Sequence, residues 1–314
     1  VLAVAITSCI EGDEPLIIEP DVAGTLFDRY VSLGNSITAG FQSGGILVDF
    51  QEEAYPVLLA EKAGAPFGIP ALTPPGCPPP LVGPVTLERT STEPCALRSF
   101  NAPDLVQNLA VPGADAGHLD AALGTETLLN TLILGGRTQL RAMRDAEPTL
   151  VSAWIGNNDA LGAALSGDTS ALTALGTFRS EYDELVSAIL ETDAQGAILI
   201  GVADPMMAAP ALQPGAYFWA IAQNPPPGLP DLDVSANCAP FDLVGNPNPG
   251  GARLVSFTYV AAQIADGADP IVIDCAEDAP GLLNETERFT IGSRIGAFNA
   301  YIQQQAAAHG GIYV

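Results

Sequence analysis

The chain has 314 residues, of which 36 are acidic and 11 are basic, so its formal net charge is −25. A surface this negative repels phosphate backbones, which excludes nucleic acid as an expected partner. Apolar residues make up 48% of the chain, enough for a sizeable core, and the longest apolar runs fall short of the roughly 20 residues of a membrane-spanning helix. With Lys62 as the only lysine, the acid excess also favours a surface suited to salt, which screens repulsion.

The first residues resemble the end of a bacterial lipoprotein signal peptide. An apolar stretch leads to Ile6-Thr7-Ser8-Cys9, in the pattern aliphatic, small, small, cysteine. We therefore expect residues 1–25 to hold a signal-peptide remnant, a lipid anchor on the Cys9 thiol and a tether. The protein would then be exported and attached to the cell envelope, in the periplasm or at the cell surface. The alternative is a short buried strand that ends in an ordinary cysteine.

Short apolar runs bounded by turn residues alternate with helical patterns over residues 26–314. This alternation predicts an α/β fold, a three-layer α/β/α sandwich with a central, mostly parallel five-stranded sheet. The predicted strands are 30–33, 105–111, 149–155 and 197–202, with the start of a fifth at 311–314, and the predicted helices are 52–63, 125–145, 170–192 and 284–308. In the last helix, Ile291, Ile295, Phe298 and Ile302 form one core-facing stripe.

Two stretches rich in proline and glycine interrupt the alternation, at about 65–101 and 205–280. Long irregular insertions in a domain usually serve as lids or binding loops. The second insertion contains Tyr217, Phe218 and Trp219, which either line an acyl pocket or pack the insertion against the sheet.

The four cysteines other than Cys9 lie in these insertions and predict two disulfides, as expected of an exported protein. Three pairings are possible, and we favour Cys77 with Cys95 and Cys238 with Cys275, because each pair lies within one insertion. Zinc is the competing interpretation, but neither a CxxC motif nor a nearby histidine supports it. We expect no metal and no cofactor.

Three successive predicted strands end in residues suited to acyl transfer. Ser36 follows Gly34 at a strand-to-helix turn, Gly113 follows the second strand, and Asn158 follows the third. The carboxyl ends of parallel strands share one edge of a sheet, where ligands bind in open α/β folds. A serine hydroxyl, a glycine N–H and an asparagine amide are the nucleophile and the oxyanion donors that acyl transfer requires.

These three segments resemble blocks I, II and III of the SGNH/GDSL hydrolases. Gly34-Asn35-Ser36 matches the GDS motif, Gly113 matches the glycine of the second block, and Gly156-Asn157-Asn158-Asp159 matches G-x-N-D. The resemblance implies a flavodoxin-like fold, Ser36 as the nucleophile, and an oxyanion hole made by the N–H of Ser36, the N–H of Gly113 and the side chain of Asn158. Asn35 replaces the usual aspartate, which we expect to tune activity rather than abolish it.

The fourth block of that family, D-x-x-H near the C-terminus, has no counterpart before Val314. We expect the histidine base and its carboxylate to lie beyond Val314, in a chain that is cut short, and the 314 residues alone to hydrolyse esters weakly or not at all. Asp115-Ala-Gly-His118 does spell D-x-x-H, but it lies directly after Gly113, which favours a loop or helix-start histidine. His309 ends a predicted helix, where a protonated imidazole complements the helix dipole.

The sequence thus predicts a serine ester hydrolase, an esterase, lipase or acylhydrolase that acts through an acyl-Ser36 intermediate. The substrate is expected to be a small ester, a lipid or an acetylated glycan. We expect a monomer that meets the membrane only through Cys9. The alternative is a non-catalytic surface lipoprotein that binds glycan or lipid in the same cleft.

Overall fold

The computed structural model describes residues 25–82, 88–93, 95, 98–99, 106–121, 127–208, 211–225, 227, 229–240 and 249–314. The expected lipobox at Cys9 and nearly all of the expected tether lie outside the described residues. No helix in the described ranges is both long enough and apolar enough to span a membrane.

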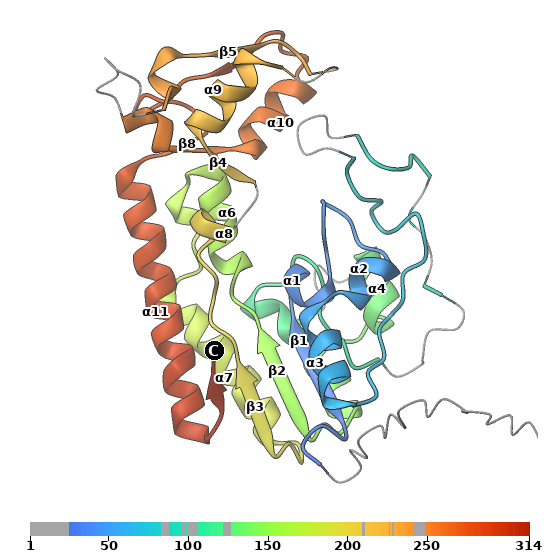
Figure 1. The fold of residues 1–314 in the computed structure, drawn as a ribbon. Helices are drawn as coiled ribbons and strands as arrows, with labels where there is room; N and C mark the ends of the chain where they lie inside the picture. Colours follow the sequence, from blue (N-terminus) through green and yellow to red (C-terminus); the bar gives the residue numbers. More distant parts are fainter. Residues whose placement is uncertain are drawn as a thin grey trace, which may run out of the picture.

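Four parallel strands form the main sheet, in the order β1-β2-β3-β9 (Figure 1). Strand β1 is buried along its whole length, as expected for a parallel strand covered on both faces. The predicted α/β fold with a parallel sheet is therefore confirmed. The strands are β1 (Tyr30–Gly34), β2 (Leu150–Trp154), β3 (Gly196–Leu199) and β9 (Ile312–Tyr313).

The segment predicted as a strand over 105–111 lies beside β1 but is not a regular strand. It joins the sheet through one isolated bridge, between Ser32 and Asn108, and its start lies outside the described residues. At its end the N–H of Val111 donates to the carbonyl of Gly34 at 3.1 Å. The N–H of Gly34 donates to the Oε1 of Gln139 at 2.9 Å rather than to this segment, which interrupts the ladder. The sheet thus has four strands and a bridged segment in the fifth place.

Each predicted helix range holds a helix, but those over 52–63 and 125–145 are interrupted, and the helix over Asn158–Ser166 was not predicted. The pattern over 125–145 breaks at Gly135 and Gly136, whose φ angles of +63° and +82° suit glycine, and Thr138 caps the helix that follows. Pro56 lies in the first turn of the helix after the other break. The helices around the main sheet are α1 (Ser36–Ala39), α2 (Val48–Glu52), α3 (Tyr55–Ala63), α4 (Leu128–Leu134), α5 (Gln139–Asp145), α6 (Asn158–Ser166), α7 (Leu175–Leu190) and α11 (Glu285–His309), with 3-10 helices η1 (Ala116–Leu119) and η2 (Thr169–Ala171).

Alternate residues of β1 and β2 face opposite sides of the sheet. Val31 and Leu33 belong to the larger core cluster, to which α5, α6, α7 and α11 contribute. Tyr30 and Leu150 face the other side, where Ala60 of α3 packs against them. Helices therefore cover both faces, which is the predicted three-layer arrangement.

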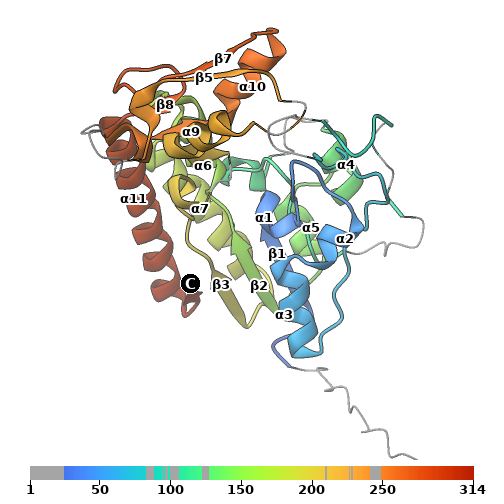
Figure 2. The ribbon, with the colours of Figure 1, turned by 45° about the horizontal axis from the view of Figure 1, so that its top comes forward.

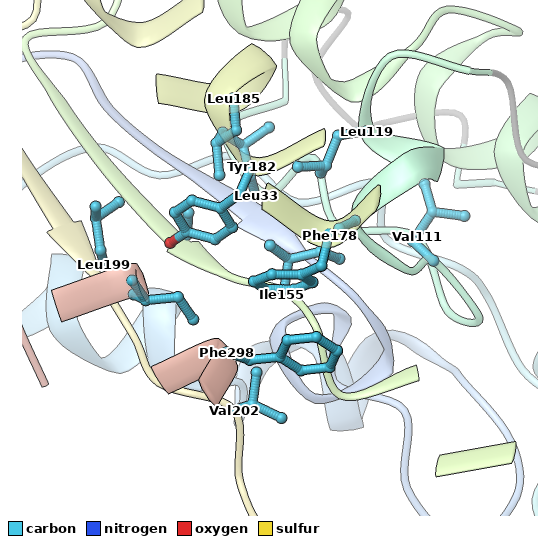
Figure 3. Close-up of a cluster of buried hydrophobic side chains, with 14 of the residues drawn as sticks. Leu33, Val111, Leu119, Ile155, Phe178, Tyr182, Leu185, Leu199, Val202 and Phe298 are labelled. Carbon is cyan, nitrogen blue, oxygen red and sulfur yellow. The ribbon is translucent and has the colours of Figure 1, made fainter. Parts of the chain in front are cut away.

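The predicted apolar stripe of α11 is buried in the larger cluster. Phe298 stacks on Phe178 of α7 with ring centroids 4.0 Å apart, and Tyr182 stacks on the far side of Phe178 at 5.5 Å (Figure 3). Ile291, Ile295 and Ile302 are each at most 5% exposed. This packing joins α11 to α7 and holds α11 against β3 and β9.

The second insertion, which we define from the structure as residues 205–283, has more order than the sequence predicts. It lies beyond the carboxyl ends of β1, β2 and β3, and its α10 packs against α6 (Figures 1 and 2). Its own buried cluster includes Phe218, Val255 and Ile271, with Tyr217 and Trp219 packed against it. Its elements are α8 (Pro205–Ala208), β4 (Leu212–Pro214), α9 (Gly215–Gln223), β5 (Leu232–Val234), η3 (Ala236–Cys238), η4 (Pro249–Ala252), β6 (Leu254–Ser256), α10 (Phe257–Ala265), β7 (Ile271–Ile273) and β8 (Leu282–Leu283).

Two disulfides are present, with the favoured pairing. Cys77 bonds Cys95, and Cys238 bonds Cys275. Cys238 and Cys275 are fully buried in the cluster of the second insertion. Their disulfide joins η3 to the segment after β7. Each disulfide thus lies within one insertion.

Candidate active site

The turn that carries Ser36 is fixed by the residues before it. Asn35 is buried and caps α1, because its Oδ1 accepts the N–H of Ile37 at 3.1 Å. Gly34 has a φ of +157°, and a Cβ at this position would lie 2.6 Å from the carbonyl oxygen of Trp154. A side chain at position 34 would therefore displace β2, which explains the glycine that the sequence places there.

Ser36 is the first residue of α1 and is half-buried. Among the described residues, neither its Oγ nor its N–H has a hydrogen-bond partner. An unpaired N–H is expected at the first position of a helix, where no earlier carbonyl is in reach. Ser36 therefore offers a hydroxyl and a backbone donor at one point.

Gly113 lies in the turn that follows the bridged segment. The N–H of Ala114 closes this turn onto the carbonyl of Val111 at 3.1 Å, and Gly113 has a φ of +90°. Glycine is exposed here, and within the described part of the chain its N–H has no acceptor. This turn, which follows the segment bridged to β1, thus presents a second free backbone N–H.

Asn158 is the first residue of α6, which follows β2. Its Nδ2 donates to the carbonyl of Ala114 at 2.6 Å. An asparagine amide has two N–H groups, so the other stays available to a ligand. The same hydrogen bond ties Asn158 to the turn of Gly113.

Hydrogen bonds connect all three segments at the carboxyl ends of the strands. Val111 donates to Gly34, Asn158 donates to Ala114, and the Nδ2 of Asn35 donates to the Oδ1 of Asn157 at 3.3 Å. The last bond needs an amide at position 35, since an ionised aspartate has no N–H to donate. The structure therefore brings together the segments of Ser36, Gly113 and Asn158, whose chemical roles remain predictions.

Gln139 is a member of this hydrogen-bond network that the sequence did not indicate. Its Nε2 donates to the carbonyl of Gly34 at 2.9 Å, and its Oε1 accepts the N–H of Gly34 at 2.9 Å. Gln139 begins α5 and is 1% exposed. A glutamine at the start of an ordinary helix carries no motif, and only the folded arrangement shows its partner 105 residues away.

Within the described residues, neither histidine makes a hydrogen bond to Ser36. His118 lies in η1, where its Nδ1 is 2.6 Å from the Oδ1 of Asp115 and its N–H donates to the same oxygen at 3.0 Å. The pair forms a capping box on its own 3-10 helix. His309 is the exposed last residue of α11. These contacts of His118 and Asp115 stabilise the first turn of η1.

Asp159, next to Asn158, is a buried carboxylic acid at 2% exposure. Its Oδ2 accepts the N–H of Ala116 at 3.0 Å, while its Oδ1 has no partner in the described residues. Burial raises the pKa of Asp159 to about 6, against the lowering effect of the hydrogen bond from Ala116. Asp159 therefore fixes the start of η1, three residues after Gly113.

Glu181 of α7 extends this acidic group. Burial raises the pKa of Glu181 to about 7, and the charges of Asp159 and Asp115 add to the rise. No group of three or more potential ligands arranged for a metal ion occurs in the described ranges. Two carboxyls of this acidic group, those of Asp159 and Glu181, thus have pKa values above their ordinary range.

Two pockets on the surface lie away from these residues. One of about 80 Å³ lies between α7, β3 and α11 and is lined by His309, and one of about 450 Å³ lies between α5 and α7. Neither is lined by Ser36, Gly113 or Asn158.

Comparison with known proteins gives only distant likenesses. No protein-family model and no curated protein sequence matches the chain. Among solved structures it is similar to an extracellular lipase from Streptomyces rimosus, with 18% identity over 90% of this chain and 78% of that one, at a TM-score of 0.36. It is also similar to a phospholipase A1 from Streptomyces albidoflavus, with 16% identity over 90% of this chain and 77% of that one, at a TM-score of 0.35. At these scores the assignment of a function depends on the geometry of the site.

Proposed function

We propose that this chain is a serine ester hydrolase of the SGNH/GDSL type, with Ser36 as its nucleophile. The observation that supports this most is the set of unpaired groups at the strand ends. Within the described residues, the hydroxyl and N–H of Ser36 and the N–H of Gly113 have no partner, and Asn158 keeps one amide N–H free. Free donors around a free hydroxyl are the requirement for stabilising a tetrahedral oxyanion.

In the proposed reaction the Oγ of Ser36 bonds to the ester carbonyl carbon, and the carbonyl oxygen becomes the oxyanion. Collapse of this intermediate breaks the bond to the alcohol and leaves an acyl-Ser36 ester, which water hydrolyses in a second addition. The N–H groups of Ser36 and Gly113 and the amide of Asn158 would donate to the oxyanion in both steps. A general base must accept the proton of Ser36 and return it to the leaving alcohol.

The substrate class that we propose is a neutral ester, whether a small ester, a lipid or an acetylated glycan. The charge of −25 disfavours polyanionic substrates. We also propose that the protein is exported and anchored through Cys9. Its two disulfides support export, because such bonds persist in oxidising compartments.

An active-site label tests the nucleophile directly. A fluorophosphonate probe reacts with an activated serine, so in the full-length protein we expect one labelled peptide, the one that contains Ser36. Labelling should be lost in Ser36→Ala and kept in Ser180→Ala, which removes an exposed serine of α7. Absence of labelling in the full-length wild-type protein would instead favour the binding protein, and binding of a glycan or a lipid would then be measured.

The same probe tests whether His118 is the base. Because its Nδ1 lies against Asp115 within its own 3-10 helix, we expect His118→Ala to keep the labelling of Ser36. Vigorous hydrolysis of p-nitrophenyl acetate by the 314-residue chain, abolished by His118→Ala, would assign Asp115 and His118 as the catalytic pair.

A further inference from the structure

The backbone two residues before Ser36 is held by one side chain from outside the three motifs. The amide of Gln139 makes two hydrogen bonds to Gly34, one to its N–H and one to its carbonyl, each at 2.9 Å. Both groups of the Gly34 residue are thus satisfied by the same side chain. Gln139 itself is buried, so water does not compete for these bonds.

Gly34 also links the segment of the proposed nucleophile to that of the proposed oxyanion donor. Its carbonyl accepts a second hydrogen bond, from the N–H of Val111, which lies two residues before Gly113. A shift of Gly34 would therefore change the position of Ser36 and of Gly113 relative to each other. A neutral amide supplies both the donor and the acceptor that Gly34 needs, whereas a carboxylate only accepts and an ammonium only donates.

We propose that Gln139 is a positioning residue for Ser36: it holds the end of β1 so that the hydroxyl and the N–H groups of the site stay in register. This inference rests on the proposed ester hydrolase function. The role of Gln139 is to fix the backbone, and it acts on the ester only through Gly34.

The variant Gln139→Met tests this, because methionine has a similar volume and makes neither bond. We expect labelling of Ser36 by the fluorophosphonate to slow about 10- to 100-fold, as expected for a small displacement of a reacting group. Amide hydrogen exchange at Gly34 should accelerate, since its N–H loses its acceptor. This second readout reports the hydrogen bond independently of catalysis.

Gln51→Met is the matched control. Gln51 is also a glutamine at 1% exposure whose Oε1 accepts a backbone N–H, that of Leu72 at 2.7 Å, but it does not contact Gly34. A comparable loss of melting temperature is expected in both variants, while the rate of labelling should fall only in Gln139→Met. Equal loss of labelling in both would show a general effect on stability and overturn the inference.

Gln139→Glu provides a pH readout. A protonated glutamic acid both donates and accepts, whereas the ionised form repels the carbonyl of Gly34. The labelling rate of this variant, divided by that of the wild type at each pH, should therefore be near one in acid and fall as the introduced carboxyl ionises. The ratio cancels the groups that both proteins share, including Asp159 and Glu181.

The outcomes separate the two proposals. Faster exchange at Gly34 with slower labelling supports the positioning role. Faster exchange at Gly34 with wild-type labelling overturns the positioning role and leaves the proposed function intact. A full-length wild-type protein that is not labelled at Ser36 overturns the proposed function, and the positioning role with it.

Discussion

Single residues fix the geometry of this site through polar atoms that bond to the backbone. Asn35 caps α1 with its oxygen and donates to Asn157 with its nitrogen, so both ends of one amide are used. Asn158 and Asp159 hold the loop after Gly113 in the same manner, one by donating to Ala114 and the other by accepting from Ala116. Each of the bonds to Asn157, Ala114 and Ala116 spans two segments that are distant in the sequence.

Asp159 makes stability depend on pH. The pKa of its carboxyl is about 6 in the folded chain, above its ordinary value of 3.8, so the folded chain binds this proton more tightly than the unfolded chain. Its contribution to stability is therefore full below about pH 4 and is lost as the pH rises through about 6. As the pH rises from about 4 through about 6, we expect the free energy of unfolding of Asp159→Asn to increase relative to that of the wild type, by at most about 3 kcal/mol.

Urea denaturation of both proteins at several pH values measures this difference. The control is Asp168→Ala, because hydrogen bonds from Ser170 lower the pKa of Asp168 on the exposed surface. Its cost should follow the opposite trend, present at neutral pH and lost in acid. If the difference between Asp159→Asn and the wild type did not change with pH, Asp159 would not carry the proton that we assign to it.

The residues of the proposed site differ in how visible they are in the sequence. Ser36, Gly113 and Asn158 could be found because each follows a buried apolar run, where parallel strands end at a common edge. Gln139 could not, because its partner is a backbone group 105 residues away. Asp159 was visible only as part of the G-x-N-D pattern, and its partner, the N–H of Ala116, lies 43 residues away. Amide and carboxyl side chains of this kind have no periodicity that distinguishes them from surface residues.

At the scale of elements, the predictions failed where glycines divide a helix and where strands are very short. The predicted helix over 125–145 is divided because Gly135 and Gly136 adopt left-handed angles, although the apolar pattern continues across them. The second insertion was predicted as irregular because its strands are two or three residues long. Strands this short give no alternating pattern, so only pairing between distant segments reveals them.

The bond between Cys238 and Cys275 should control the stability of the second insertion. It closes a loop with a sequence separation of 37 residues around the small cluster of Phe218 and Ile271. A bond of this kind contributes about 2–4 kcal/mol, mostly by restricting the unfolded chain. In the double variant Cys238→Ala, Cys275→Ala we expect limited proteolysis to cut first within 205–283.

The matched variant is Cys77→Ala, Cys95→Ala, which removes a bond with a sequence separation of 18 residues in the first insertion. It should leave the second insertion resistant to protease. Equal resistance of the wild type and the Cys238 and Cys275 variant would show that the cluster holds the insertion without the disulfide.

For the whole molecule, the acid excess predicts a response to salt. The net charge of −25 lowers the stability of the folded chain through repulsion, which ions screen as the Debye length falls from about 10 Å at 0.1 M to about 3 Å at 1 M. We expect the melting temperature to rise between these NaCl concentrations by a few degrees.

Measuring the same series near pH 4 provides the control, because protonation of the carboxyls removes much of the repulsion and should shrink the effect of salt. A melting temperature that falls as NaCl is raised at neutral pH would contradict a surface adapted to saline conditions.

The second insertion enters the chain after β3 and leaves it directly into α11, and β6 lies between β4 and β8 in its small sheet. The strands near its two ends, β4 and β8, therefore both pair with β6 in one small sheet. None of Ser36, Gly113, Asn158 and Gln139 lies between residues 205 and 283. Evolution or protein engineering could thus exchange this segment as a cassette and change what approaches the sheet edge, while the groups proposed for the chemistry keep their sequence.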